Sequence, residues 1–250
     1  MLTEPLGTFL VFLLALLWVA AGGHFLRSLD GQRSRAWLGI ALVLGGIGAA
    51  LAGISYQAFS YELKCAGRAH CVLTNGFEIG YGVTQAFSVS AMLTAVAFAC
   101  TSGVPRRALF AYSAANAAAY LGVAGAGAAW PSRTLLSFEV LLLFALPGIL
   151  LVILLGARRF VRFRRPADGH LLVAALLLIA VQAVYFGYRT AGLTQRLWDG
   201  GRGFYFSEND ALHVGMMLWL AYAVAFLGPH LRDVVAGPTP LTASRWGSSP

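Results

Sequence analysis

Long apolar runs separated by short polar stretches make up most of the chain. Crossing a lipid bilayer as a helix takes about 20 apolar residues, and seven runs are long enough to do so. The pattern therefore predicts an all-α polytopic membrane protein with seven transmembrane helices, whose domain covers residues 1–235. The predicted spans are roughly residues 5–27, 36–60, 75–100, 106–129, 133–157, 169–191 and 209–231.

Composition agrees with a lipid environment. Of the 250 residues, 58% are hydrophobic and 11% are charged, whereas a soluble domain carries roughly 25% charged residues. No soluble core of this length can absorb so many apolar side chains, so the chain is predicted to be an integral membrane protein. Small residues in the stretches 39–55 and 118–129 would let helix backbones approach each other closely.

Basic residues predict the orientation. If the N-terminus lies outside, the inner segments hold twelve basic residues and the outer segments hold six. Because cytoplasmic loops carry the excess of Lys and Arg, this predicts a multi-pass protein of the plasma (bacterial inner) membrane, N-out and C-in. The stretch ARRFVRFRRP (157–166) is the strongest anchor. The net charge of +8 is then explained by topology, and no nucleic-acid partner is predicted. Residues 236–250, rich in Pro, Ser and Thr, are predicted to form a disordered cytoplasmic tail.

Two cysteines provide a separate test of this orientation. Cys65 and Cys71 lie in the second loop, YELKCAGRAHCVLTN (61–75), where Gly67 can supply a turn. In the N-out topology this loop faces an oxidising compartment, in which a disulfide persists. The alternative is a metal site that also uses His70, although the spacing fits no usual zinc pattern.

Polar residues recur at helical spacing in three of the predicted helices. Residues three or four apart share a helix face, and in this topology all of these stripes lie in the outer half of the membrane. They predict an outward-facing polar pocket with His213 near its floor. The candidate ligand-binding residues are Ser55, Gln57, Glu78, Tyr81, Gln85, Glu139, Tyr185, Arg189, Asp210 and His213.

Several of these residues also have a purely structural explanation. Ser207-x-x-Asp210 and Asn75-x-x-Glu78 have the spacing of a capping box, which satisfies backbone N–H groups at a helix start. Glu139 is predicted about two turns inside its helix, where it needs a partner such as Arg189 or Arg133. Of these candidates, His213 is the least explained by structure alone.

An acid and a histidine at the start of the last of seven helices resemble a feature of the superfamily of alkaline ceramidases and progestin/adiponectin receptors. The resemblance implies a buried zinc site, built from Ser-x3-His in the second helix, an Asp near the third and His-x3-His in the seventh. This chain has Ser55-x3-Phe59 and His213-x3-Met217, so both steps lack a histidine, and Glu78 is the nearest acid. The segment SYQAFSYELKCAGRAHC also resembles a family of uncharacterised bacterial seven-helix proteins.

Two classes of function therefore stay open. One is a binder or sensor of a small molecule or lipid, with the aromatic outer loop 194–210 as a ligand lid or as an interfacial belt that includes Phe204. The other is a metal-dependent hydrolase acting on a lipid amide or ester. Its candidate ligands are His213, Glu78 and Asp210, a carboxylate-rich set that suits a harder divalent ion than zinc.

Overall fold

The structure is a computed structural model that describes residues 5–200 and 205–234. All regular elements among these residues are helical. Residues 236–250, for which a tail is predicted, and Phe204 lie outside the described residues. The long helices are α1 (Pro5–Arg27), α2 (Arg33–Ala52), α4 (Gly76–Cys100), α5 (Gly103–Ala129), α6 (Phe138–Phe163), α7 (Pro166–Thr190) and α9 (Glu208–Tyr222).

Short elements extend or connect these helices. A π-helical segment, η1 (Gly53–Ala58), continues α2, and a second one, η2 (Ala223–Leu227), continues α9 into the 3-10 turn η3 (Gly228–His230). The loops carry α3 (Ser60–Lys64) and α8 (Leu193–Asp199).

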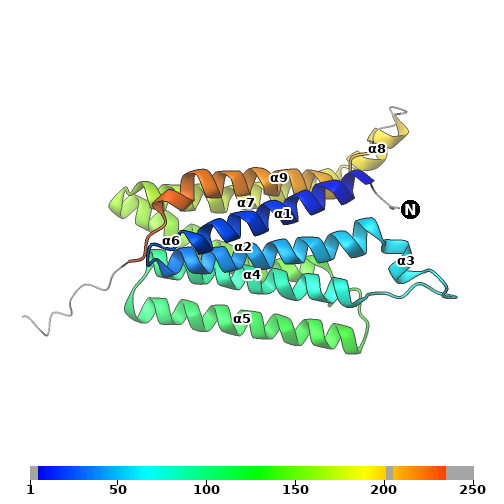
Figure 1. Cartoon of the computed structure of the whole chain (residues 1–250), viewed down its shortest axis with the longest axis horizontal. Coiled ribbons are helices and arrows are strands. Elements are labelled where there is room, and N and C mark those ends of the chain that lie inside the picture. The colour runs from blue at the N-terminus through cyan, green and yellow to red at the C-terminus, as the bar shows by residue number, and fades with distance from the viewer. Residues whose placement is uncertain (1–4, 201–204, 235–250) are drawn as a thin grey trace, which may run out of the picture.

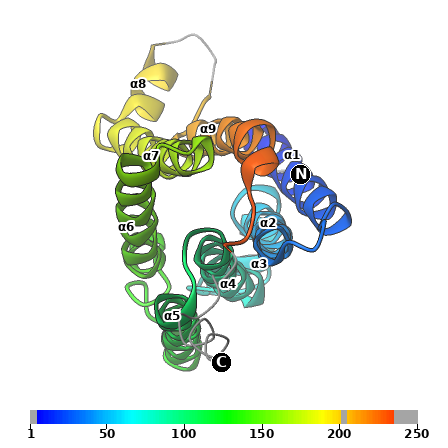
Figure 2. The same ribbon diagram turned by 90° about the vertical axis from the view of Figure 1, so that its left-hand side faces the viewer.

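The long helices run side by side (Figure 1) and form a ring when viewed along their axes (Figure 2). Going round the ring, α1 packs on α2, α2 on α4, α4 on α6, α6 on α7 and α7 on α9, which packs on α1. Helix α5 lies at the periphery, chiefly against α4. The ring therefore brings the first and last long helices together.

Six helices among the described residues are long and apolar enough to cross a membrane, which supports a multi-pass membrane protein. They match all the predicted spans except the fourth. Helix α5 has the length but not the apolar composition, because it is built largely from Ala and Gly and begins with Arg106 and Arg107.

The predicted fifth span, 133–157, is misplaced by several residues. Ser137 caps α6 by accepting a hydrogen bond from Val140 N at 3.2 Å, and the helix runs on through its arginines to Phe163. Glu139 consequently lies in the first turn of α6, not two turns inside the helix. The helix therefore starts at its serine cap and not where the apolar run begins.

Glycines allow α2 to pack closely against its neighbours. A Cβ on Gly22 of α1 would lie 2.7 Å from the carbonyl oxygen of Gly39, and a Cβ on Gly46 would lie 2.8 Å from that of Ala15. On another side of α2, a Cβ on Gly45 would overlap the ring of Trp18. Such contacts are how helices pair in lipid, where no hydrophobic effect drives them together.

One end of the ring, here called the disulfide end, carries α3 and the Cys65–Cys71 bond, with a Cα–Cα separation of 4.2 Å. The predicted disulfide is therefore present. Gly67, inside the closed loop, has a φ of +69°, a backbone conformation that glycine adopts at little cost.

The opposite end, here called the arginine end, is held by two carboxylates. Asp233, beyond the last helix, accepts hydrogen bonds from the backbone N–H groups of Arg33 at 2.9 Å and Ser34 at 2.8 Å, and so caps α2. Asp168, whose side chain is 3% exposed, pairs with Arg159 at 2.7 Å. Arg159 also donates to the carbonyl oxygen of Cys100 at 2.7 Å. These contacts join elements far apart in the sequence.

Candidate ligand-binding cavity

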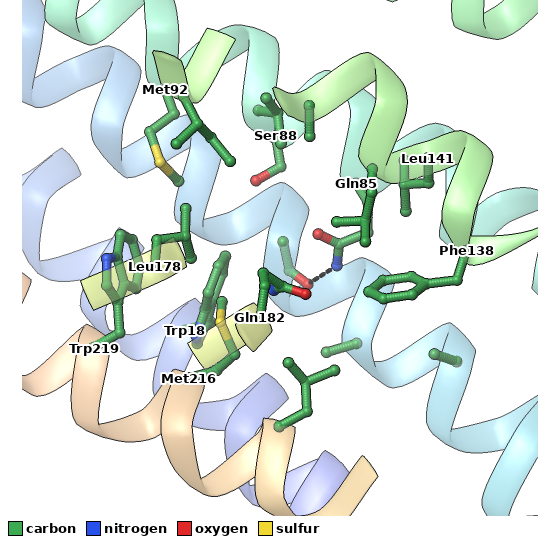
Figure 3. Close-up of a pocket in the computed structure, with 18 of the residues that line it drawn as sticks. Trp18, Gln85, Ser88, Met92, Phe138, Leu141, Leu178, Gln182, Met216 and Trp219 are labelled. Atoms are coloured by element: carbon green, nitrogen blue, oxygen red, sulfur yellow. Dashed lines mark hydrogen bonds between the residues drawn. The ribbon is translucent and has the colours of Figure 1, made fainter. Parts of the chain in front are cut away.

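A cavity of about 620 Å³ lies inside the ring, and all seven long helices contribute to its lining. It extends from Glu78 and Arg189 at the disulfide end to Leu231 at the arginine end. Most of the lining residues are apolar, and Figure 3 shows a part of them. Both the volume and the lining are typical of sites that bind small molecules, which measure about 300–1,000 Å³.

Glu78 anchors a buried polar cluster at the disulfide end. Its carboxylate accepts a hydrogen bond from Ser55 Oγ at 3.0 Å and forms an ion pair with Lys64. Asn75 donates to Ser55 Oγ at 2.8 Å and caps α4 by accepting from the N–H groups of Phe77 and Glu78. Of the predicted Asn75-x-x-Glu78 capping box, Asn75 therefore supplies the cap. The Glu78 side chain, 7% exposed, pairs with Lys64 instead.

Lys64 is a member of this cluster that sequence reasoning missed. Its ammonium group also lies 5.1 Å from the centre of the Tyr56 ring, which lines the cavity. One signal could have found it: Lys64 is the only lysine among the 18 basic residues of the chain.

The π-helical segment η1 decides which residues of this region reach the cavity. Gln57 and Tyr56 line the cavity, whereas Ser55 is fully buried behind Glu78. Ser55 is therefore not part of the lining, and it hydrogen-bonds the Glu78 carboxylate instead. Wider π turns of this kind occur frequently at functional sites.

The predicted charge pair between Glu139 and Arg189 is present. Arg189 donates to Glu139 Oε1 at 3.1 Å, and both residues line the cavity. Their side chains are 52% and 50% exposed, so the pair lies at the rim of the cavity.

The FSENDALH segment divides its polar groups between two tasks. Ser207 and Asp210 form the predicted capping box at the start of α9, with Asp210 Oδ2 2.7 Å from Ser207 N. Asp210 is 1% exposed and does not line the cavity, because the capping box holds its side chain. His213, one turn further, does line the cavity, and its Nδ1 has no hydrogen-bond partner among the described residues.

The three candidate metal ligands have separate surroundings. The Glu78 carboxylate is engaged by Ser55 and Lys64, and Asp210 by Ser207. Over residues 5–200 and 205–234, no group of three His, Cys, Asp or Glu side chains is placed to hold a metal ion. The predicted set of Glu78, Asp210 and His213 is therefore not assembled.

The deeper part of the cavity differs from the predicted pocket. The cavity continues from His213 past Trp219 to Leu231, so His213 does not lie at its floor. Met92, Met216 and Trp219 line this part (Figure 3). Sequence reasoning missed them because an aromatic or methionine in an apolar run has the same pattern whether it faces lipid or a cavity.

Most of the predicted residues nevertheless meet around one space. Those that line the cavity are Gln57, Glu78, Tyr81, Gln85, Glu139, Tyr185, Arg189 and His213. They come from η1, α4, α6, α7 and α9. Helices α1 and α5 also line the cavity, through residues such as Trp18 and Tyr120, although neither was predicted to do so.

Comparison with known proteins adds no relative. No protein-family model, curated protein or solved structure matches this chain. The geometry of the cavity is therefore the basis for assigning a function.

Proposed function

We propose that this protein is a seven-helix protein of the plasma membrane that binds a small amphipathic or lipid molecule in the cavity inside its ring. The observation that carries this proposal is the cavity of about 620 Å³, apolar over most of its length and polar at one end. A lipid-like molecule has the same division between an apolar chain and a polar head. The chain would lie against the apolar lining, and the head would point toward the disulfide end.

The proposed topology has seven spans, with the N-terminus outside and the C-terminus in the cytoplasm. Helix α5 has 27 residues, about 40 Å at 1.5 Å per residue, which is enough to cross the hydrocarbon core. It lies alongside α4 in Figures 1 and 2. The arginine end is then cytoplasmic, in agreement with the excess of basic residues.

This topology places the Cys65–Cys71 bond on the oxidising side of the membrane. Isolated membranes are denatured and alkylated without a reductant, then reduced and labelled with a second reagent; we expect these two cysteines to be tagged only in the second step. Cys100, free and buried, serves as the internal control, because it reacts in the first step once the protein is denatured. Three cysteines alkylated in the first step would place the loop on the reducing side.

Ligand binding can be measured through two tryptophans, because Trp18 and Trp219 both line the cavity with ring centres 5.6 Å apart. Brominated chains quench indole fluorescence on contact. The starting protein keeps only these two fluorophores, the other tryptophans being replaced by Phe: Trp37, Trp130, Trp198 and Trp246. In micelles of an unbrominated detergent, we expect dibromostearyl alcohol to quench the fluorescence in a saturable manner.

A matched pair of substitutions locates the binding. Gly148 lines the cavity, and a Cβ there would meet its nearest neighbour only at 3.9 Å, so Gly148→Leu fills the cavity. Gly187 lies on the outside of α7 with nothing within 4 Å, so Gly187→Leu is the control. We expect Gly148→Leu to weaken binding about tenfold, since losing the burial of two methylenes costs roughly 1.6 kcal/mol. Equal effects of both substitutions, or no saturable quenching at all, would contradict the proposed function.

A further inference from the structure

Four uncharged polar side chains from four helices line the cavity between its two ends. They are Trp18 of α1, Gln85 of α4, Gln182 of α7 and His213 of α9, here called the polar girdle. Trp18 and Gln85 both contact Gly45 of α2, which places them at the same level of the ring. Figure 3 shows Gln85 and Gln182 directed into the same space from α4 and α7.

The girdle has unused hydrogen-bonding capacity. Trp18 Nε1, Gln182 Oε1 and His213 Nδ1 are buried and have no partner within the described part of the chain. Trp18 and His213 are also more than nine-tenths buried as whole residues. By contrast, Gln85 Nε2 donates to the carbonyl oxygen of Gly45 at 3.0 Å. A buried polar atom without a partner costs about 1–3 kcal/mol, so these three, with Gln57 Oε1 also lining the cavity, indicate a partner that occupies it.

Whether each of these atoms donates or accepts a hydrogen bond determines which polar groups the ligand must carry. The indole N–H only donates, and the amide oxygen of Gln182 only accepts. A single group that satisfies both needs an acceptor and a donor, as a hydroxyl or a carboxamide has. An ester carbonyl accepts but cannot donate.

Charge further restricts the ligand. The girdle contains no charged side chain, and the nearby charges at the disulfide end are already engaged: Glu78 pairs with Lys64, Arg189 pairs with Glu139, and the Asp210 carboxylate accepts hydrogen bonds from Ser207 in the α9 capping box. A carboxylate or phosphate at the girdle would be a charge at membrane depth without a counter-ion, which is costly.

Resting on the proposed function, we propose that the ligand is an uncharged long-chain amphiphile whose hydroxyl or amide group is held by the polar girdle. Its chain extends toward the arginine end, along Trp219 and Leu227 to Leu231. The girdle then selects the ligand by its polar group, and the apolar part of the cavity accommodates the chain.

The test compares four probes with the same dibrominated chain: dibromostearyl alcohol, dibromostearamide, methyl dibromostearate and dibromostearate. Quenching of Trp18 and Trp219 gives the dissociation constant of each. We expect the alcohol and the amide to bind about tenfold more tightly than the ester and the anion, because each of the latter leaves a girdle atom unpaired. This comparison uses one protein and needs no further substitution.

Substitutions then assign the preference to the girdle. Gln182→Leu should reduce the alcohol-to-ester preference to about twofold or less, since it removes the acceptor that the hydroxyl hydrogen needs and the ester does not use. Asn116→Leu is the control, because Asn116 is an amide of α5 that does not line the cavity. Saturable binding with equal affinity for all four probes would overturn this inference and leave the proposed function intact. No saturable quenching by any probe would overturn both.

Discussion

Replacing Asp168 with asparagine should lower the free energy of unfolding by about 3–5 kcal/mol, because it leaves the Arg159 guanidinium buried without its counter-charge. The pair is well shielded: Asp168 is 3% exposed, and the two side chains are 2.7 Å apart. The measurement is unfolding in mixed micelles with increasing SDS, followed by helical circular dichroism. The double variant Arg159→Met, Asp168→Asn should recover most of the loss, since it removes both charges.

Glu139→Gln provides the matched control for this prediction. It also removes one carboxylate from an arginine pair, but both partners are about half exposed. Exposed pairs contribute about 0–1 kcal/mol, so this substitution should change the free energy of unfolding by less than that. Equal effects of Asp168→Asn and Glu139→Gln would show that burial does not distinguish the two pairs.

Replacing Gly22 with alanine is expected to destabilise the protein by about 2 kcal/mol, because overpacking a close contact costs roughly 1–3 kcal/mol. The new Cβ would lie 2.7 Å from the carbonyl oxygen of Gly39 and 2.9 Å from the backbone nitrogen of Val43. These atoms belong to the α2 backbone, so α1 and α2 would have to separate.

The next residue is an internal control for this prediction. A Cβ on Gly23 meets nothing within 4 Å. Gly23→Ala should therefore be neutral or stabilise α1 by about 0.5–1 kcal/mol, the usual gain from replacing a helical glycine by alanine. Both variants are compared by the same SDS titration, and a loss of stability in Gly23→Ala as large as in Gly22→Ala would refute the packing explanation.

The sequence predicted the helices well because crossing a bilayer requires long apolar runs. The start of α6 was wrong because the apolar run begins before the cap at Ser137. The prediction that α5 crosses the membrane rests on its length, because a helix rich in Ala and Gly is less apolar than the other long helices. Helix positions were thus predictable, but the order in which helices neighbour one another was not.

The candidate site was predictable where polar residues interrupt an apolar run. Glu78, Gln85 and His213 stand out for this reason, and all three line the cavity. The direction of each side chain was not predictable, because Asp210 and His213 share a spacing that fits one face. In the structure the capping box holds Asp210 and leaves His213 in the cavity. Trp18 was missed because nothing in an apolar run distinguishes a residue that faces a cavity.

The cap on α2 has a consequence for how the protein is made. The first two N–H groups of α2 are bound by Asp233, which is separated from Arg33 by 200 positions in the chain. During synthesis these groups stay without this partner until residue 233 has left the ribosome. The α2 cap consequently forms only after α9 has been made, and it joins the α1–α2 pair to the segment that follows α9.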